Sequence, residues 1–351
     1  MARRAYIDWL RGLAVVVMIL AHTSDSWTRL ADRSTRAYDL VVKISGMAAP
    51  LFLFLAGVSV VLAAGGKARR TGDVAAAAAA VRRRGWQIFG LAFLFRLQAM
   101  VIGWGRLAGL LKVDILNVMG PSMVGAAALW GVSTRPRVRI ALLASAACAF
   151  SLLSPIIRGW SWLGVLPDPL EWYFRPPPGR SWFTFFPWAG LLLAGAVIGV
   201  VIDSTRNDAQ EARANRWLLV GGAALVVTAL VGSRYPSLYA HSSFWTTSPS
   251  YFFLRIGLMS AMIGAAYFLA RWWPPRPSSA MLEFGHSSLF VYWIHVELVY
   301  SWISYPLRKS LPLGWALAAF ALFTWAMLWM SRKKTAFVSR RAQRRARSRP
   351  V

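Results

Sequence analysis

The stretch IDWLRGLAVVVMILAHTSDSW, residues 7–27, decides the fold. Its centre, LAVVVMILA, is apolar enough to lie in lipid, and the stretch is long enough to cross a bilayer as a helix. The same stretch carries Asp8, Arg11 and His22, and Asp25 lies near its end. Ionisable groups inside a membrane span are costly, so a helix that keeps them is expected to use them.

The rest of the chain is equally apolar. Hydrophobic residues make up 57% of the 351 positions and charged residues only 15%, and the mean hydropathy is +0.47. This composition is typical of a polytopic membrane protein, and the 19 Trp fit it because Trp favours membrane interfaces. The sequence predicts an all-α membrane helix bundle of about ten transmembrane helices. Their expected limits are 6–23, 44–66, 85–105, 114–132, 140–158, 183–202, 217–232, 250–270, 286–305 and 314–331.

The net charge of +27 is distributed as a topology signal. With both termini in the cytoplasm, the inward loops hold 25 Lys and Arg and the outward loops hold 12, as the positive-inside rule requires. We therefore expect a transmembrane domain over residues 1–331. Residues 332–351 are expected to form a disordered basic cytoplasmic tail that contacts anionic membrane lipid, and no nucleic-acid partner is expected.

The polar groups of the first stretch share one face of the predicted helix. Arg11 and His22 are eleven residues apart, which places them on the same side about 16 Å apart along the axis. Asp8 precedes Arg11 by three residues and Asp25 follows His22 by three, so each pair is adjacent on the helix. A carboxylate beside an imidazole can fix its tautomer and raise its basicity. The alternative is structural: Asp8 and Arg11 anchor the span at the headgroups, and His22 is a buried hydrogen-bonding group.

Four more ionisable residues fall in later spans. Arg96 lies deep in its span and is expected to meet an anion or a buried carboxylate, unless it reaches outward to solvent. Arg255 is expected to snorkel at the outer face. His295 and Glu297 point in different directions, so one can face a cavity and the other a neighbouring helix.

The loop GWSWLGVLPDPLEWYFRPPPGRSW, residues 159–182, is long, aromatic and rich in proline. Such a loop suits either a membrane interface, which we favour, or a sugar-binding face. The single Cys148 excludes an intramolecular disulfide and a cysteine metal site. Nucleotide-binding loops, nucleophile elbows and zinc-protease motifs are absent, and no metal is expected.

Six segments in order resemble the transmembrane acyltransferase superfamily, in particular bacterial relatives of the heparan-alpha-glucosaminide N-acetyltransferase catalytic domain. The first helix resembles the family's I-D-x-x-R-G start, although Ala21 replaces the Asp of its D-H pair. The spacing of Arg11 and His22 is also similar to that of the acyltransferase-3 branch, which is the second choice. The other five segments are PLFLFLAGVSV (50–60), RRRGWQIFGLAFLFR (82–96), VDILNVMGPSM (113–123), FTFFPWAGLLLAGAVIG (183–199) and FGHSSLFVYWIH (284–295).

The resemblance implies an acyltransferase in the bacterial inner membrane. It would move an acetyl or other short acyl group from cytoplasmic acetyl-CoA to a sugar amine or hydroxyl on the outer side. We recognise no separate lumenal domain, so a bacterial surface or secreted glycan is the expected acceptor rather than heparan. Two other functions remain open: a secondary transporter of a small solute, and a non-catalytic glycan-export subunit.

The resemblance also implies roles for individual residues. His22 would be the general base with Asp25 orienting it, or alternatively would carry the acyl group as an acyl-imidazole. The CoA-binding groups would be Arg11, Arg82, Arg83, Arg84 and Arg96, because arginine suits phosphate recognition, although Arg82–Arg84 can also be topology signal alone. The substrate or acyl path would be lined by Asp8, Asn117, His286 and His295.

Overall fold

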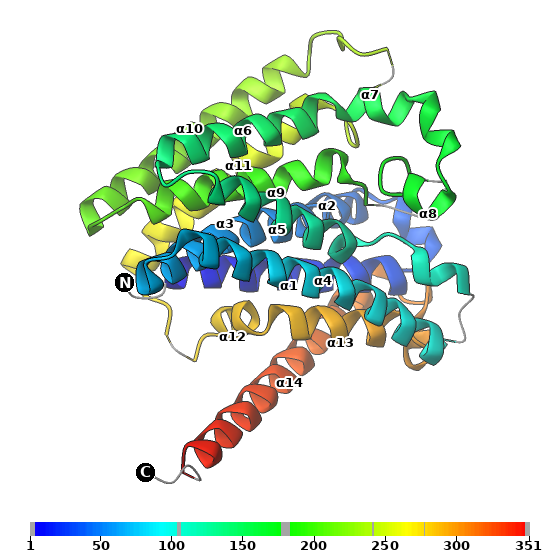
Figure 1. Cartoon of the computed structure of the whole chain (residues 1–351). Helices are drawn as coiled ribbons and strands as arrows, with labels where there is room; N and C mark the ends of the chain where they lie inside the picture. The colour runs from blue at the N-terminus through cyan, green and yellow to red at the C-terminus, as the bar shows by residue number, and fades with distance from the viewer. Residues whose placement is uncertain (1–3, 104–106, 177–182, 241, 277, 348–351) are drawn as a thin grey trace. The chain divides into compact units, whose positions relative to one another are not determined.

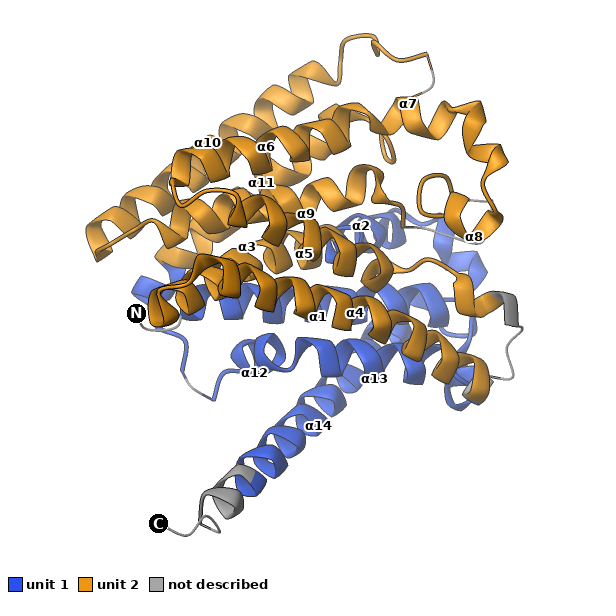
Figure 2. Cartoon of the chain, in the orientation of Figure 1, with its two compact units in different colours: residues 1–49, 269–351 blue, residues 50–268 orange. Residues whose placement is uncertain are grey.

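The structure is a computed structural model that describes residues 4–103, 107–176, 183–240, 242–276 and 278–347 (Figure 1). The chain forms two compact units (Figure 2). Unit 1 contains residues 1–49 and 269–351, and unit 2 contains residues 50–268. Unit 1 therefore joins the two ends of the chain, which the prediction of one transmembrane domain over residues 1–331 does not anticipate.

Unit 1 is built around the first helix. Its helices are α1 (Ala5–Trp27), η1 (Leu30–Ser34), α2 (Arg36–Ser45), α12 (Ala280–His286), α13 (Ser288–Tyr300), η4 (Trp302–Leu307) and α14 (Leu313–Arg347). Helix α1 packs against α2, α12, α13 and α14. Beyond the end of α1, the backbone of Thr28 pairs with that of Leu311 in an isolated bridge. Asp32 accepts a 2.7 Å hydrogen bond from the backbone N–H of Leu313, which begins α14.

Two glycines let α1 and α12 approach each other at backbone distance. A Cβ added at Gly12 would overlap the backbone carbonyl of Met281, and a Cβ added at Gly285 would overlap the backbone carbonyl of Asp8. Small residues at membrane helix interfaces allow this kind of close packing. The contact holds Asp8 of α1 beside the end of α12, where His286 lies.

Unit 2 contains the remaining spans. Its elements are α3 (Ala48–Thr71), α4 (Val74–Gly103), η2 (Leu107–Leu111), α5 (Ile115–Gly131), α6 (Pro136–Leu152), α7 (Ser154–Gly159), η3 (Ser161–Val165), α8 (Asp168–Glu171), α9 (Phe185–Asp203), α10 (Asp208–Gly232) and α11 (Pro249–Trp272). Helix α5 packs against α4, α6 and α9, and α6 also packs along α9.

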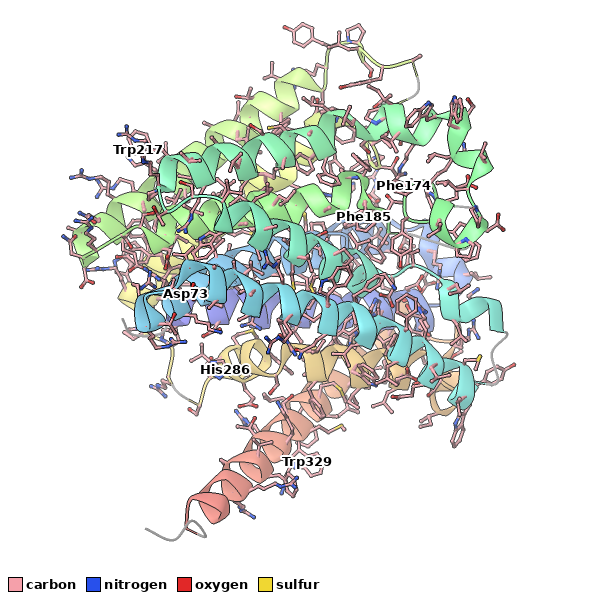
Figure 3. All side chains as sticks on the ribbon, viewed as in Figure 1. Asp73, Phe174, Phe185, Trp217, His286 and Trp329 are labelled. Carbon is pink, nitrogen blue, oxygen red and sulfur yellow. The ribbon has the colours of Figure 1, made fainter. Side chains whose placement is uncertain are left out.

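Aromatic side chains gather where α9 begins. Val113, Val118 and Trp172 form a buried cluster, and the partly buried rings packed against it are those of Tyr173, Phe183, Phe185 and Trp188. Phe174 and Phe185, labelled in Figure 3, extend this group, with ring centroids 6.2 Å apart. Trp172, Tyr173 and Phe174 of the loop before α9 thus pack within unit 2, whereas Trp160 and Trp162 of the same loop are exposed.

The described chain confirms the predicted fold class. Its regular structure is helical, without a β-strand in the described ranges, and eight helical segments are long and apolar enough to cross a membrane. The expected span 85–105 falls largely on α4, and the expected span 286–305 falls on α13, a shorter apolar helix, and on η4. The tail differs from expectation, because α14 continues from its apolar part into the basic segment as far as Arg347 (Figure 1).

Candidate active site

Two histidines from the ends of the chain meet in unit 1. Nδ1 of His22 on α1 lies 2.8 Å from Nε2 of His295 on α13, and their rings stack with centroids 5.0 Å apart and planes 9° apart. His295 is fully buried, whereas His22 is half-buried. Of the two residues, His22 is therefore the less buried.

The hydrogen bonds assign the tautomers of this pair. Nδ1 of His295 lies 2.7 Å from the backbone carbonyl oxygen of Val291, which can only accept, so this nitrogen carries a proton. In neutral His295, Nε2 then has a lone pair and accepts from Nδ1–H of His22. Neutral His22 is left with the lone pair on its own Nε2. The chain of contacts thus produces one oriented basic nitrogen.

Asp25 lies near this pair but bonds to other groups. Its side chain is 63% exposed and forms a 3.8 Å ion pair with Arg33. The hydroxyl of Tyr300 donates to Oδ2 of Asp25 at 3.1 Å, and the Tyr300 ring meets the His22 ring edge to face at 5.6 Å. Arg33 also donates to the backbone oxygen of Asp25. The group that bonds to and orients the His22 ring is consequently His295 rather than Asp25.

A second polar cluster lies at the other end of α1. Asp8 forms ion-pair contacts with Arg11 at 3.3 Å and with Nε2 of His286 at 3.5 Å (His286 is labelled in Figure 3). Arg11 also donates to the hydroxyl of Ser288 at 3.0 Å. The predicted Asp8/Arg11 pair thus exists, and it connects α1 to the junction of α12 and α13.

Helix α14 reaches the same junction. Lys334 donates to the Ser287 hydroxyl at 3.4 Å, and Thr335 donates to Glu283 at 2.6 Å. The basic segment after the last span is in this way anchored to the break between α12 and α13. Glu283 and Ser287 were not among the residues singled out from the sequence.

Unit 2 holds two of the other predicted residues, Arg96 and Asn117, in structural contacts. Arg96 pairs with the buried carboxylate of Asp114 at 3.2 Å, which is one of the two partners expected for it. Asp114 and Asn117 form a capping box at the start of α5. Asn117 also donates to the Tyr173 hydroxyl at 3.3 Å. Burial raises the pKa of that hydroxyl, and the hydrogen bond from Asn117 partly offsets the effect.

The three arginines proposed for CoA phosphates lie on the exposed surface of α4. Arg84 donates to the side chain of Gln87 at 3.3 Å. Within the described chain no carboxylate pairs with Arg82, Arg83 or Arg84. Their guanidinium groups can accordingly take phosphate oxygens without breaking an ion pair.

Sequence reasoning missed several participants. Ser288 and Tyr300 are ordinary residues in an apolar span and acquire a role only through contacts with α1. Arg255 was expected to snorkel, but its side chain is buried, with 9% of its surface exposed. The sequence did contain a signal for Arg255. An arginine seven residues into a span, without an acidic residue nearby on the same helix, is a candidate for a buried functional group.

A protein-family model matches a large part of the chain. The family model described as heparan-alpha-glucosaminide N-acetyltransferase, catalytic, matches residues 3–230. The match includes Asp8, Arg11, His22 and Asp25 but ends before His286 and His295. Among curated proteins, no match was found. The match extends over more than half of the chain, and together with the apolar helices it makes the protein a multi-pass membrane acetyltransferase. The chain belongs to the family of the heparan-alpha-glucosaminide N-acetyltransferase catalytic domain.

Proposed function

We propose that the protein transfers an acetyl group from cytoplasmic acetyl-CoA to an amine or hydroxyl of a sugar on the outer side of the bacterial inner membrane. His22 is the general base. The observation that carries the proposal is the chain from the Val291 carbonyl through His295 to His22, which leaves Nε2 of His22 with a lone pair.

This nitrogen can perform the proton transfer that acyl transfer needs. As the acceptor oxygen or nitrogen forms its bond to the acetyl carbonyl carbon, Nε2 of His22 takes the acceptor's proton. When the carbon–sulfur bond breaks, the proton goes to the departing thiolate, and free CoA and acetylated sugar result. A positioned general base of this kind contributes about 10²–10⁴-fold to the rate.

Two groups beside His22, Tyr300 and Asp25, take supporting roles. Tyr300 lies against the His22 ring and donates to Asp25. The Asp25 carboxylate thus lies on the far side of the Tyr300 hydroxyl from the His22 ring. We infer that Asp25 stabilises the imidazolium formed during transfer rather than orienting the ring.

For the acyl donor, α4 offers three arginines that form no ion pair with a carboxylate of the described residues. Arg82, Arg83 and Arg84 would hold the phosphates of CoA on the cytoplasmic side, because the positive-inside distribution places this end of α4 there. The cluster of Asp8, Arg11, His286 and Ser288 would line the path of the acyl group along α1. Acetyl-CoA supplies the activated thioester, and the residues of the chain bind it and move the proton.

The test is release of CoA by the purified protein in detergent, with acetyl-CoA and a panel of amino sugars. His22→Ala should lower the rate at least a hundredfold, as expected for loss of a general base. Thr228→Ala, which changes an exposed threonine of α10, is the matched control and should retain the wild-type rate. Equal CoA release by wild type and His22→Ala in folded preparations would refute the assignment.

A further inference from the structure

Unit 2 buries an arginine without an acidic partner. Arg255 on α11 lies with its guanidinium 3.9 Å from the ring centroid of Tyr251 and 5.5 Å from that of Trp188. Its Nε is buried and makes no hydrogen bond, and no carboxylate in the described part of the chain forms an ion pair with it. A buried charge without a counter-charge is costly, so a protein that keeps one normally has something to place against it.

A second arginine of the same kind approaches from α7. Arg158 donates through one terminal nitrogen to the Thr184 hydroxyl at 3.1 Å. Its Nε is also buried without a hydrogen bond, and within the described ranges it too has no carboxylate partner. Two other arginines of unit 2 have acidic partners, since Arg69 is paired with Asp203 and Arg96 with Asp114. Arg139 lies over the Trp130 ring and donates to the Trp130 carbonyl, away from the beginning of α9 in sequence.

Both arginines contact residues at the beginning of α9. Arg158 bonds to Thr184, the N-cap residue of α9, and Arg255 lies over Trp188, four residues further along. The amino-terminal end of a helix adds partial positive charge to this place. Arg158, Trp188 and Tyr251 are all half-buried, so the pair of guanidinium groups is bordered by rings that reach the surface.

We propose that Arg158 and Arg255 bind one oxyanion, a carboxylate or a phosphate, at the start of α9, with Trp188 and Tyr251 contacting the body of the ligand. An oxyanion there supplies the missing counter-charge and accepts from the two unused Nε–H groups. Guanidinium groups bind such anions through paired hydrogen bonds, and aromatic faces suit the apolar face of a sugar ring. On the proposed function, on which this step rests, the anion belongs to an acidic acceptor sugar.

The phosphate of a lipid headgroup could bind the two arginines in the same way as the carboxylate of an acidic sugar. The following experiment distinguishes these two ligands. Binding to the purified full-length protein is measured calorimetrically with glucuronate against glucose, and in nanodiscs of phosphatidylglycerol against phosphatidylcholine. Tighter binding of glucuronate than of glucose identifies an acidic sugar site. Stabilisation by phosphatidylglycerol, without binding of glucuronate, identifies a lipid site.

Arg255→Met and Arg158→Gln should each lower the affinity for the anion at least tenfold, which is the usual effect of losing one charge-assisted hydrogen bond. Arg234→Gln, which alters an exposed arginine after α10, should bind as the wild type does. Without anion, Arg255→Met should unfold at the same or a higher temperature than wild type, because it removes an uncompensated charge. If Arg255 only stabilised the fold, the Arg255→Met variant would instead unfold at a lower temperature than the wild type.

The proposal is overturned if neither anion binds more tightly than its neutral counterpart, a comparison that needs only the wild-type protein. It is also overturned if Arg234→Gln loses as much affinity as Arg255→Met. Because anion binding is measured without acetyl-CoA, its failure leaves His22-dependent CoA release intact. Conversely, loss of that CoA release in a protein that still binds the anion would refute the proposed function alone.

Discussion

Nε2 of His295 accepts a hydrogen bond from Nδ1–H of His22. Nδ1–H of His295 in turn donates a hydrogen bond to the backbone carbonyl of Val291, one turn earlier on α13. One backbone oxygen thereby determines which nitrogen of a distant histidine is basic. The resemblance implies a place for His295 along the acyl path, and we propose that it acts as a positioning residue for His22, because it is fully buried and bonds to the His22 ring.

Replacement of His295 should therefore lower the turnover number and leave the Michaelis constant of acetyl-CoA nearly unchanged. His295→Leu removes the acceptor for Nδ1–H of His22, and misorientation of a catalytic group costs up to about a hundredfold in rate. His295→Gln restores an acceptor oxygen and should recover part of the loss. Steady-state kinetics of CoA release over a range of pH measure both effects, and equal rates for the two variants would contradict the positioning role.

Gly285→Ala should destabilise unit 1. The added methyl group would overlap the backbone of Asp8, so α1 and α12 must separate, at a cost of about 1–3 kcal/mol. Gly221→Ala is the control, because a Cβ there meets nothing within 4 Å. A helical alanine in open space should leave stability unchanged or raise it by about 0.5–1 kcal/mol. Thermal unfolding in detergent compares the two variants, and a neutral Gly285→Ala would show that the close contact carries no energy.

Removal of either partner of the Arg96–Asp114 ion pair should destabilise unit 2 by about 3 kcal/mol or more, because the other charge stays buried alone. Asp114→Asn is the informative change at its position, since Asn keeps the capping function at the start of α5. The double variant Arg96→Leu with Asp114→Asn should cost less than the sum of the single changes. A double-mutant cycle by thermal unfolding gives the coupling, and additive effects would exclude the interaction.

Asp32 should make stability depend on acid pH. The backbone hydrogen bond from Leu313, and then the hydrogen bond from Arg29, lower the pKa of its carboxyl from the ordinary 3.8. The carboxylate thus stabilises the folded state above pH 3.8, and this contribution is lost as the pH falls from there through the lowered value. Asp32→Asn should unfold at a lower temperature than wild type near neutral pH, and the difference should shrink below pH 3.8. An unchanged difference across that window would show that ionisation of Asp32 is irrelevant.

The sequence predicted the fold class because long apolar runs and loop charges report directly on membrane helices. It also placed Arg11 and His22 on one helix, where spacing alone determines the face. It could not pair His22 with His295, because α13 has no periodic signal that selects its contacts and the two residues are 273 positions apart. Asp25 was the expected orienting group because it is near in sequence, yet its side chain bonds to Tyr300 and Arg33.

The same limit applies in unit 2. Arg96 was predicted to meet an anion or a carboxylate, and Asp114 fulfils the second possibility. Asn117 was expected along the acyl path, but its side chain caps α5 and bonds to Tyr173. A capping role depends on where a helix begins, and sequence patterns locate helix ends less well than helix centres.

The union of the chain's two ends in unit 1 affects how the protein is made. His22 leaves the ribosome 273 residues before His295, and synthesis at about 5–20 residues per second makes that interval about 14 to 55 s. Throughout that time α1 must reside in the membrane without α12, α13 and α14. Asp8 and Arg11 are three positions apart on α1, so their ion pair forms within this helix alone. The two opposite charges therefore neutralise each other before α12, α13 and α14 are made. This local ion pair thus lowers the free-energy cost of inserting a charged first helix into the membrane before the helices that pack against it have been synthesised.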